Sequence, residues 1–302
     1  GKLLAAVLAI VMVVCAFAAI TADDTSAVVT GLPDADEDTG VITLTKDTTV
    51  SGTGTITNAI NLGNYTLKIS EGANVTINYA FTAAGQHVID FGSNGKIIVE
   101  EGATLTINAS NGTVEGKPYV PTNSAGNSVF AGATTTGYTS NGTDAAIQVN
   151  GTMNVKVAAD VKGNTNQAER TIYVTGTFNS DSNGYATTMF LINGGKVDVN
   201  LNDGSLTGYV DVSGEGASFE IGGTNVTGSK ITGVTYEDSI FNIFAMNVGE
   251  GASATIDGKA QILDREVTSP PVGTISTITN NGNVAITKDG QLAVPEDTAF
   301  TN

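Results

Sequence analysis

The chain has 302 residues, which is enough for one large domain with a genuine hydrophobic core. Its 30 acidic and 13 basic residues give a net charge of −17, which disfavours nucleic acid and anionic lipid headgroups as partners of the folded surface. With 37 Gly, no Trp and many Thr, Val, Ile and Asn residues, the composition disfavours long helices. It predicts a mainly β protein of many short strands joined by tight turns.

The first segment of the chain is apolar. Lys2 is followed by Leu3 to Ile20, a run without charge, Gly or Pro. One interpretation is a secretory leader that is cleaved, since small residues supply cleavage sites at Ala16, Ala18 and Ala22. The other is a retained helix, about 27 Å long at about 1.5 Å per residue and barely able to span a bilayer. We therefore expect residues 1–22 to form one hydrophobic helix that acts as leader, membrane anchor or filament core.

Gly1 to about Ala22 resembles the N-terminal segment of archaeal type IV pilins, in which a short basic leader is cut just ahead of an apolar segment. The resemblance implies that this helix is retained and packs in the core of a filament. The single cysteine, Cys15, lies in the same segment, so the rest of the chain cannot form a disulfide. Val14 occupies the position where a lipoprotein signal needs a small residue, and we interpret Cys15 as a packed apolar thiol.

Residues 23–40 are acidic and polar, and we expect them to form a linker. Alternate carboxylates at Asp34, Asp36 and Asp38 precede Gly40, an order similar to that of a calcium loop. The Gly comes one place late, and Thr45 stands where such a loop has Glu. These three aspartates are the candidate calcium ligands, with a solvated linker as the alternative. No other cofactor is predicted.

An internal repeat organises residues 41–268, where apolar and polar residues alternate with the period of half-buried strands. The segment 62–77, LGNYTLKISEGANVTI, matches 92–107, GSNGKIIVEEGATLTI, at an offset of 30 residues. The aligned apolar pairs are Leu67 with Ile97, Ile69 with Val99, Val75 with Leu105, and Ile77 with Ile107. The Glu-Gly-Ala motif recurs at 215–217 and 250–252, so each copy predicts two strands joined by a turn in which Gly supplies the backbone conformation.

Such units must stack or pair to bury their apolar faces, either as coils of a β-solenoid or as hairpins of a β-sandwich. The copies are 30, 114 and 35 residues apart, and this irregularity argues against a regular solenoid. We still favour a solenoid, with irregular coils, because of the resemblance of its units. The units resemble those of secreted β-helix adhesin-like proteins of archaea and bacteria; two examples are GTITNAINLGNYTLKISEGA and NGGKVDVNLNDGSLTGYVDVSGEGA. The resemblance spans most of Val41 to Val294 and implies a place on the cell surface. Pro270 and Pro271 break the pattern, so residues 269–302 are expected to add separate C-terminal strands.

No catalytic motif is evident, and the chain is not predicted to be an enzyme. The single histidine, His87, has no triad context and is interpreted as a strand-edge residue. A polysaccharide lyase on a β-helix would need clustered carboxylates for calcium with a Lys or Arg as base. The two arginines, Arg170 and Arg265, stand in polar surroundings, where we expect ordinary ion pairs.

The sequence also contains candidate surface sites. Seven Asn-x-Ser/Thr sequons could carry glycans in an exported protein: Asn64, Asn74, Asn108, Asn111, Asn141, Asn150 and Asn225. Four aromatic residues could line a carbohydrate groove, although core packing explains the phenylalanine better: Tyr65, Tyr79, Phe81 and Tyr138.

Three functions remain open, and all three place the protein outside the cell. The first is a subunit of a pilus-like surface filament, whose partners are copies of itself and, before assembly, the membrane through residues 3–22. The second is a surface adhesin or carbohydrate-binding protein with host or environmental glycans as partners. The third is a β-helix polysaccharide lyase.

Overall fold

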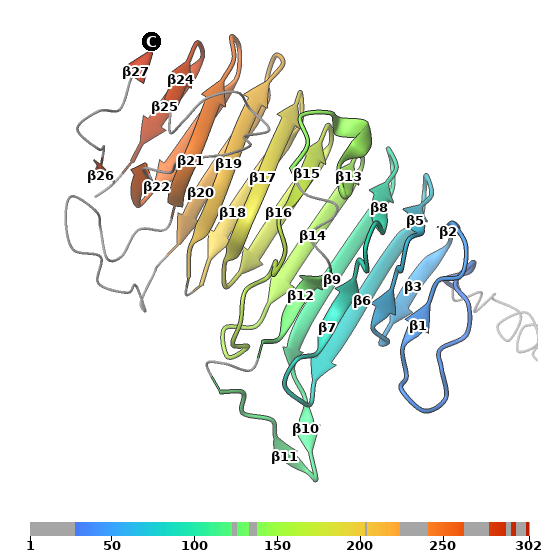
Figure 1. Cartoon of the computed structure of the whole chain (residues 1–302). Helices are drawn as coiled ribbons and strands as arrows, with labels where there is room; N and C mark the ends of the chain where they lie inside the picture. The colour runs from blue at the N-terminus through green and yellow to red at the C-terminus, as the bar shows by residue number, and fades with distance from the viewer. Residues whose placement is uncertain are drawn as a thin grey trace, which may run out of the picture.

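The computed structural model describes residues 28–122, 126–132, 138–202, 204–223, 241–262, 278–287, 291–293 and 300–301. Within these residues the chain is mainly β, as predicted, and its strands form long parallel sheets (Figure 1). The coils follow one another along the molecule from the N-terminal to the C-terminal end. The predicted helix over residues 1–22 lies outside the described residues. In the part that is described, no helix is long and apolar enough to cross a membrane.

The largest sheet has twelve strands. Ten of them follow one another in space in this order: β2 (Thr48–Val50), β5 (Thr66–Ile69), β8 (Lys96–Val99), β13 (Ile147–Val149), β15 (Arg170–Val174), β17 (Tyr185–Asn193), β19 (Leu206–Ser213), β21 (Phe241–Val248), β23 (Lys259–Ile262) and β26 (Gln291–Ala293). Two more extend the sheet beside β21: β24 (Ile278–Asn280) and β27 (Phe300–Thr301).

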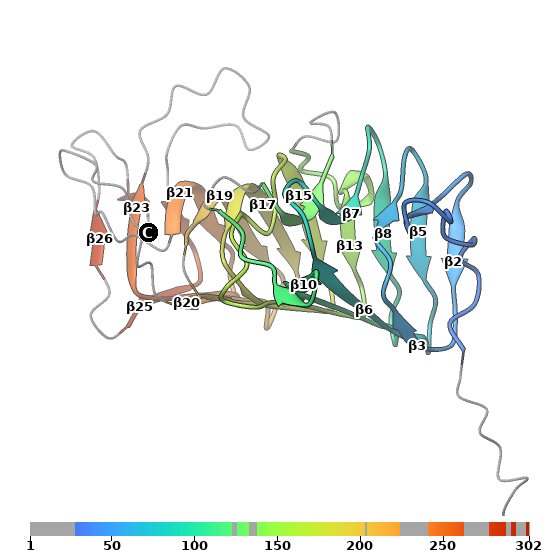
Figure 2. The ribbon, with the colours of Figure 1, turned by 90° about the horizontal axis from the view of Figure 1, so that it is seen from below.

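The second sheet has nine strands and runs beside the first. In spatial order they are β3 (Thr53–Ile56), β6 (Asn74–Phe81), β9 (Thr104–Asn111), β14 (Thr152–Val157), β16 (Thr177–Ser182), β18 (Lys196–Leu201), β20 (Ser218–Gly223), β22 (Ser253–Asp257) and β25 (Asn283–Ile286). Figure 2 shows this sheet along the lower side of the molecule, with β2, β5 and β8 rising from it.

A shorter third sheet closes the N-terminal coils. It contains β1 (Ile42–Thr43), β4 (Ile60–Asn61), β7 (His87–Asp90) and β12 (Ser128–Ala131). A small antiparallel hairpin leaves the coils at β10 (Thr113–Val114) and β11 (Lys117–Pro118), and one 3-10 helix, η2, spans Gly142–Asp144.

The repeated Glu-Gly-Ala motif forms the corner between the two large sheets. Gly72 and Gly102 both adopt φ of 74°, a conformation that a residue with a Cβ resists. The turns close with hydrogen bonds from the N–H of Ala73 to the carbonyl of Ser70 and from Ala103 to Glu100, both 3.0 Å. The strands on either side of each turn then join different sheets, so the motif is a corner of a coil.

Parallel pairing distinguishes the two predicted architectures. In a sandwich of hairpins, the strands that flank a short turn would pair with each other in antiparallel fashion. Instead β5 pairs in parallel with β2 and β8, and β6 pairs in parallel with β3 and β9. This arrangement is consistent with a β-solenoid and does not fit the sandwich.

The register confirms the predicted repeat alignment. Leu67 lies opposite Ile97 in the twelve-stranded sheet, and Val75 lies opposite Leu105 in the nine-stranded sheet. The next partner of Ile97 is Ile147, and the one after it is Ile172, so successive coils differ in length. The irregular spacing of the motif therefore reflects unequal coils in one continuous stack.

The core lies between the sheets and is made of aliphatic and aromatic side chains that stack from coil to coil. Its centre is an aromatic column in which Phe190 contacts Phe178 at 5.5 Å and Phe219 at 6.0 Å between ring centroids. A buried polar group interrupts the apolar stack, because the Ser180 hydroxyl lies 2.6 Å from the hydroxyl of Tyr185. Burial raises the pKa of Tyr185, so its hydroxyl stays protonated and available as a donor.

The ends of the described chain extend the same stack. Within the predicted linker, Val29, Leu32 and Ala35 pack against the first coil, and Thr30 forms an antiparallel bridge with Ser51. Despite its acidic residues, this part of the predicted linker therefore covers the N-terminal end of the stack of coils. Beyond the prolines, β24 pairs with β21 and β25 with β22, so the last described strands continue both large sheets.

Candidate functional site

The outer face of the nine-stranded sheet is polar from β3 to β22. Because side chains alternate across a strand and the strands are parallel and in register, outward residues form straight rows across the coils. One row contains hydroxyls and amides before it reaches a lysine: Thr53, Asn74, Thr104, Thr152, Thr177, Lys196, Ser218 and Ser253. The next row becomes acidic towards the C-terminal coils: Thr55, Thr76, Thr106, Asn154, Asn179, Asp198, Glu220 and Thr255.

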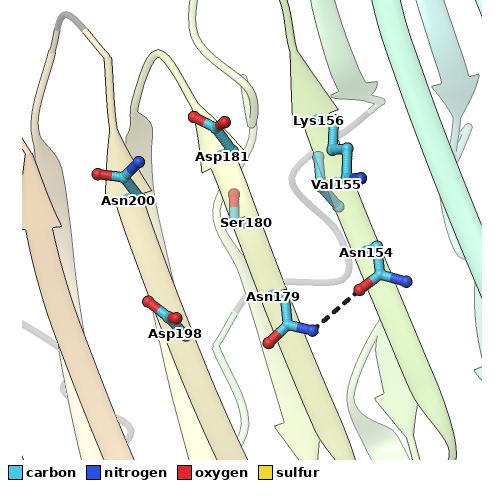
Figure 3. A pocket seen from close by; sticks show the side chains of 8 residues that line it. All are labelled: Asn154, Val155, Lys156, Asn179, Ser180, Asp181, Asp198 and Asn200. Carbon is cyan, nitrogen blue, oxygen red and sulfur yellow. Dashed lines mark hydrogen bonds between the residues drawn. The ribbon is translucent and has the colours of Figure 1, made fainter.

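A shallow pocket of 160 Å³ lies on this face where β14, β16 and β18 run side by side (Figure 3). Six polar side chains from these strands form a grid of two rows and three columns, which we call the polar grid. One row is Asn154, Asn179 and Asp198, and the other is Lys156, Asp181 and Asn200. Val155 and Ser180 also line the pocket; they lie between the two rows in sequence, and their side chains are buried on the inner side of the sheet.

Hydrogen bonds fix one side of the polar grid and leave the other open. Asn179 donates through Nδ2 to Oδ1 of Asn154 at 2.9 Å, and Asn154 donates to the hydroxyl of Thr106 at 3.2 Å. Lys156 and Asp181 are in register but do not form an ion pair within 4.0 Å. In the described ranges the one such pair joins Lys68 to Glu100. The grid thus presents an ammonium, carboxylates and amides to solvent, spaced by about 4.8 Å across strands and about 6.6 Å along them.

The candidate calcium residues do not converge. Asp36 accepts hydrogen bonds through Oδ1 from the N–H of Asp38, the N–H of Thr39 and the hydroxyl of Thr39, at 3.2, 2.8 and 2.8 Å. These hydrogen bonds lower the pKa of Asp36, the one from the Thr39 hydroxyl most of all. Among the residues that the structure describes, no group of three His, Cys, Asp or Glu side chains is arranged to hold a metal ion. Asp36 therefore stabilises a turn, and the geometry adds no support for calcium at Asp34, Asp36 and Asp38.

The structure brings His87 next to a hydroxyl that the sequence did not single out. Nδ1 of His87 lies 2.9 Å from Oγ of Ser128 on the neighbouring strand, and this hydroxyl donates to the carbonyl of Phe130 at 3.1 Å. When the Ser128 hydroxyl donates to this carbonyl, it can only accept from His87, and the imidazole does not then activate it as a nucleophile. Burial lowers the pKa of His87, while the charge of Asp90 acts in the opposite direction.

Arg170 does not occupy the surface position expected for it. Its side chain is fully buried inside the coils, and its guanidinium lies 4.1 Å from the ring centroid of Phe91. The expectation failed because Arg170 begins β15 on the inward face of the strand, which it shares with Ile172 and Val174, while its polar neighbour Gln167 stays exposed. Arg265, the other arginine, is outside the described residues.

The candidate aromatic residues do not gather on one surface. Tyr138 packs against Tyr209 at 4.9 Å between ring centroids, within a buried cluster on the outer side of the twelve-stranded sheet. Phe81 is a core residue, with the half-buried Tyr79 at 5.3 Å. Tyr65 is 37% exposed. These four residues therefore do not line a shared groove.

The sequons differ in how their amides are used. Three of the amides donate to other protein atoms: Asn108 to Oδ1 of Asn78, Asn111 to the carbonyl of Asp160, and Asn141 to Oδ2 of Asp144. Oδ1 of Asn150 accepts from the hydroxyl of Thr175. Asn64, in a turn, Asn74, on β6, and Asn141 are exposed, but the amide of Asn141 is held by Asp144, so Asn64 and Asn74 are the most accessible of the described sequons. Asn225 lies outside the described residues.

The polar grid had no signal in the sequence, because its residues come from three coils of unequal length. The sequence shows alternating strand patterns with Asn and Asp on one face, but it does not indicate which of these strands are neighbours in the sheet. Comparisons of the chain with protein-family models, with curated proteins and with solved structures found no match.

Proposed function

We propose that the chain is an extracellular surface protein whose solenoid binds a neutral, hydroxyl-rich glycan at the polar grid. The observation that carries this proposal is the convergence of amide, carboxylate and ammonium groups from three coils around one shallow pocket. Sugar hydroxyls both donate and accept hydrogen bonds, and the grid supplies partners of both kinds. The extracellular location rests on the apolar segment Leu3 to Ile20 and on the absence of cysteine beyond Cys15.

The size of the pocket and the net charge of the chain favour this class of ligand. Its volume of 160 Å³ is below the range of about 300–1,000 Å³ that is typical of pockets for drug-sized molecules. A pocket of this size suits one sugar unit of a longer chain that lies along the sheet. The net charge of −17 disfavours polyanionic polysaccharides.

The test is a glycan array followed by titration calorimetry on the best ligand. Asn179→Ala removes one amide of the polar grid and should weaken binding about three- to tenfold, the value of one net hydrogen bond. Asn78→Ala is the matched control, because Asn78 also belongs to an exposed Asn–Asn pair on the same sheet but lies outside the grid. Equal binding by both variants, or no glycan bound by the wild type, would contradict the proposal.

A second candidate is a subunit of a surface filament that assembles through residues 3–22. The observation that favours it is the uninterrupted apolar run at the start of the sequence, with its resemblance to archaeal type IV pilins. Electron microscopy of protein purified from its source tests this candidate. Filaments would support it, whereas dispersed monomers that lack residues 1–22 would exclude it.

A further inference from the structure

Among the residues that the structure describes, Arg170 is a buried cation without a counterion. Its side chain has 0% exposure. Nε donates to the carbonyl of Ala168 at 3.5 Å, and neither Nη1 nor Nη2 has a hydrogen-bond partner among the described residues. Two amino groups that can donate four hydrogen bonds are therefore enclosed and unused.

The described neighbours of Arg170 supply no negative charge to its Nη atoms, and Oδ1 of Asn166, a neutral acceptor, makes no hydrogen bond to them. Asn166 uses its amide nitrogen on the carbonyl of Ala168 and on the hydroxyl of Thr188. Asp90, the acidic residue whose charge acts on Arg170, accepts from the N–H of Gly92 at 2.8 Å and makes no ion pair with Arg170 within 4.0 Å. The ring of Phe91 covers one face of the guanidinium and leaves its edge free for hydrogen bonds.

Deprotonation of the guanidinium does not remove the unpaired buried charge at neutral pH. Burial lowers the pKa of Arg170 to about 10, partly offset by the charge of Asp90, so the guanidinium remains charged at neutral pH. A charge held in the interior without a partner is strongly destabilising. The interior of the solenoid therefore needs a negative charge beside the Nη atoms.

We propose that the guanidinium edge of Arg170 binds a small inorganic anion, such as chloride, inside the solenoid. A monatomic ion fits this site better than a phosphate or a carboxylate ligand, because the side chain is completely enclosed. Hydrogen bonds from a charged donor to an anion are among the strongest in proteins. The ion is enclosed as the coils around β7, β12 and β15 close, and it acts as a structural ligand of the folded state.

Crystallography on the wild-type protein tests the proposal directly. Crystals grown in sodium bromide, with data collected at the bromine absorption edge, should show an anomalous peak at hydrogen-bond distance from Nη1 or Nη2. Water density at these atoms without an anomalous signal would overturn the proposal. Peaks at surface lysines count neither way and serve as an internal control for bromide in the crystal.

Thermal unfolding of the full chain supplies the second measurement. Sodium chloride replaces sodium methanesulfonate at constant ionic strength, so general screening does not change. Each tenfold rise in chloride above its Kd should raise the folding equilibrium constant of the wild type about tenfold, and Tm should rise with it. Arg170→Met should abolish this dependence.

The matched control is Lys68→Met, which removes a cation from the surface ion pair with Glu100 and should keep the chloride dependence of the wild type. An equal response to chloride in wild type and Arg170→Met would refute anion binding at this residue. If Arg170→Met does not fold, the bromide experiment on the wild type still decides the question.

Discussion

Truncation of Phe190 to alanine should remove the centre of the aromatic column. Phe190 is fully buried, with ring centroids of Phe178, Tyr185 and Phe219 at 5.5, 5.9 and 6.0 Å. Its ring therefore joins both large sheets and two neighbouring coils, and collapse around the cavity would have to shift paired strands. We expect a loss of about 3–5 kcal/mol in the free energy of unfolding, out of a total that is about 5–15 kcal/mol for most proteins.

The assay is urea unfolding followed by circular dichroism in the β region and by tyrosine fluorescence. Because stacked coils can unfold in parts, coincidence of the two signals has to be checked before a free energy is derived. Tyr65→Ala is the control, since Tyr65 is 37% exposed and its loss should change stability by less than about 0.5 kcal/mol. A loss below about 1 kcal/mol for Phe190→Ala would show that the column repacks and would refute this reasoning.

Three further predictions concern buried polar groups and surface sites. Tyr185→Phe should cost about 1–3 kcal/mol, because it removes the hydroxyl that lies 2.6 Å from the buried Ser180 and leaves Ser180 only its hydrogen bond to Ser182 at 3.0 Å. Urea unfolding measures this, and no loss would mean that Ser180 finds another donor. His87 is the single histidine, and burial lowers its pKa in the folded protein below 6.5. Between these two pKa values the imidazole is protonated more often in the unfolded chain than in the folded one. The free energy of unfolding should therefore fall as pH falls from 6.5 through the folded pKa. An NMR titration of the one imidazole gives that pKa directly, and a pH dependence unchanged in His87→Gln would disprove this link. Protein from a glycosylating host should carry glycans at Asn64 and Asn74 before any other described sequon, and peptide mass spectrometry that finds both bare while others are modified would contradict this.

The strands and their alignment could be predicted from the sequence because the signals are local. The pairs Leu67 with Ile97 and Val75 with Leu105 were aligned by the motif that follows or precedes them, and these residues lie side by side in the sheets. The Gly of each motif predicted the turn, since φ of 74° at Gly72 is a conformation that other residues avoid.

The path of the chain after each turn could not be predicted from the sequence. A short Glu-Gly turn can close a hairpin or form the corner of a coil, and only contacts with the coils before and after decide between the two. The placement of Arg170 failed because its polar neighbours in sequence do not reveal that it shares the inward face of β15 with Ile172 and Val174. The polar grid depends on the pairing of Asn154 with Asn179 and of Asn179 with Asp198, which unequal coil lengths conceal.

The hairpin of β10 and β11 shows what unequal coils permit. Its turn has positive φ at Glu115 and Gly116, 50° and 74°, as in a two-residue type I′ turn, and all four of its strand residues are exposed. It leaves the stack after β9, while β9 and β14 on either side of this excursion remain paired in register. Added sequence at a corner therefore projects sideways without changing the coils above and below it. A peptide tag or a small foreign domain grafted between Val114 and Lys117 should be displayed at the side of the rod, which makes this protein a scaffold for presenting sequences at a fixed position along its length.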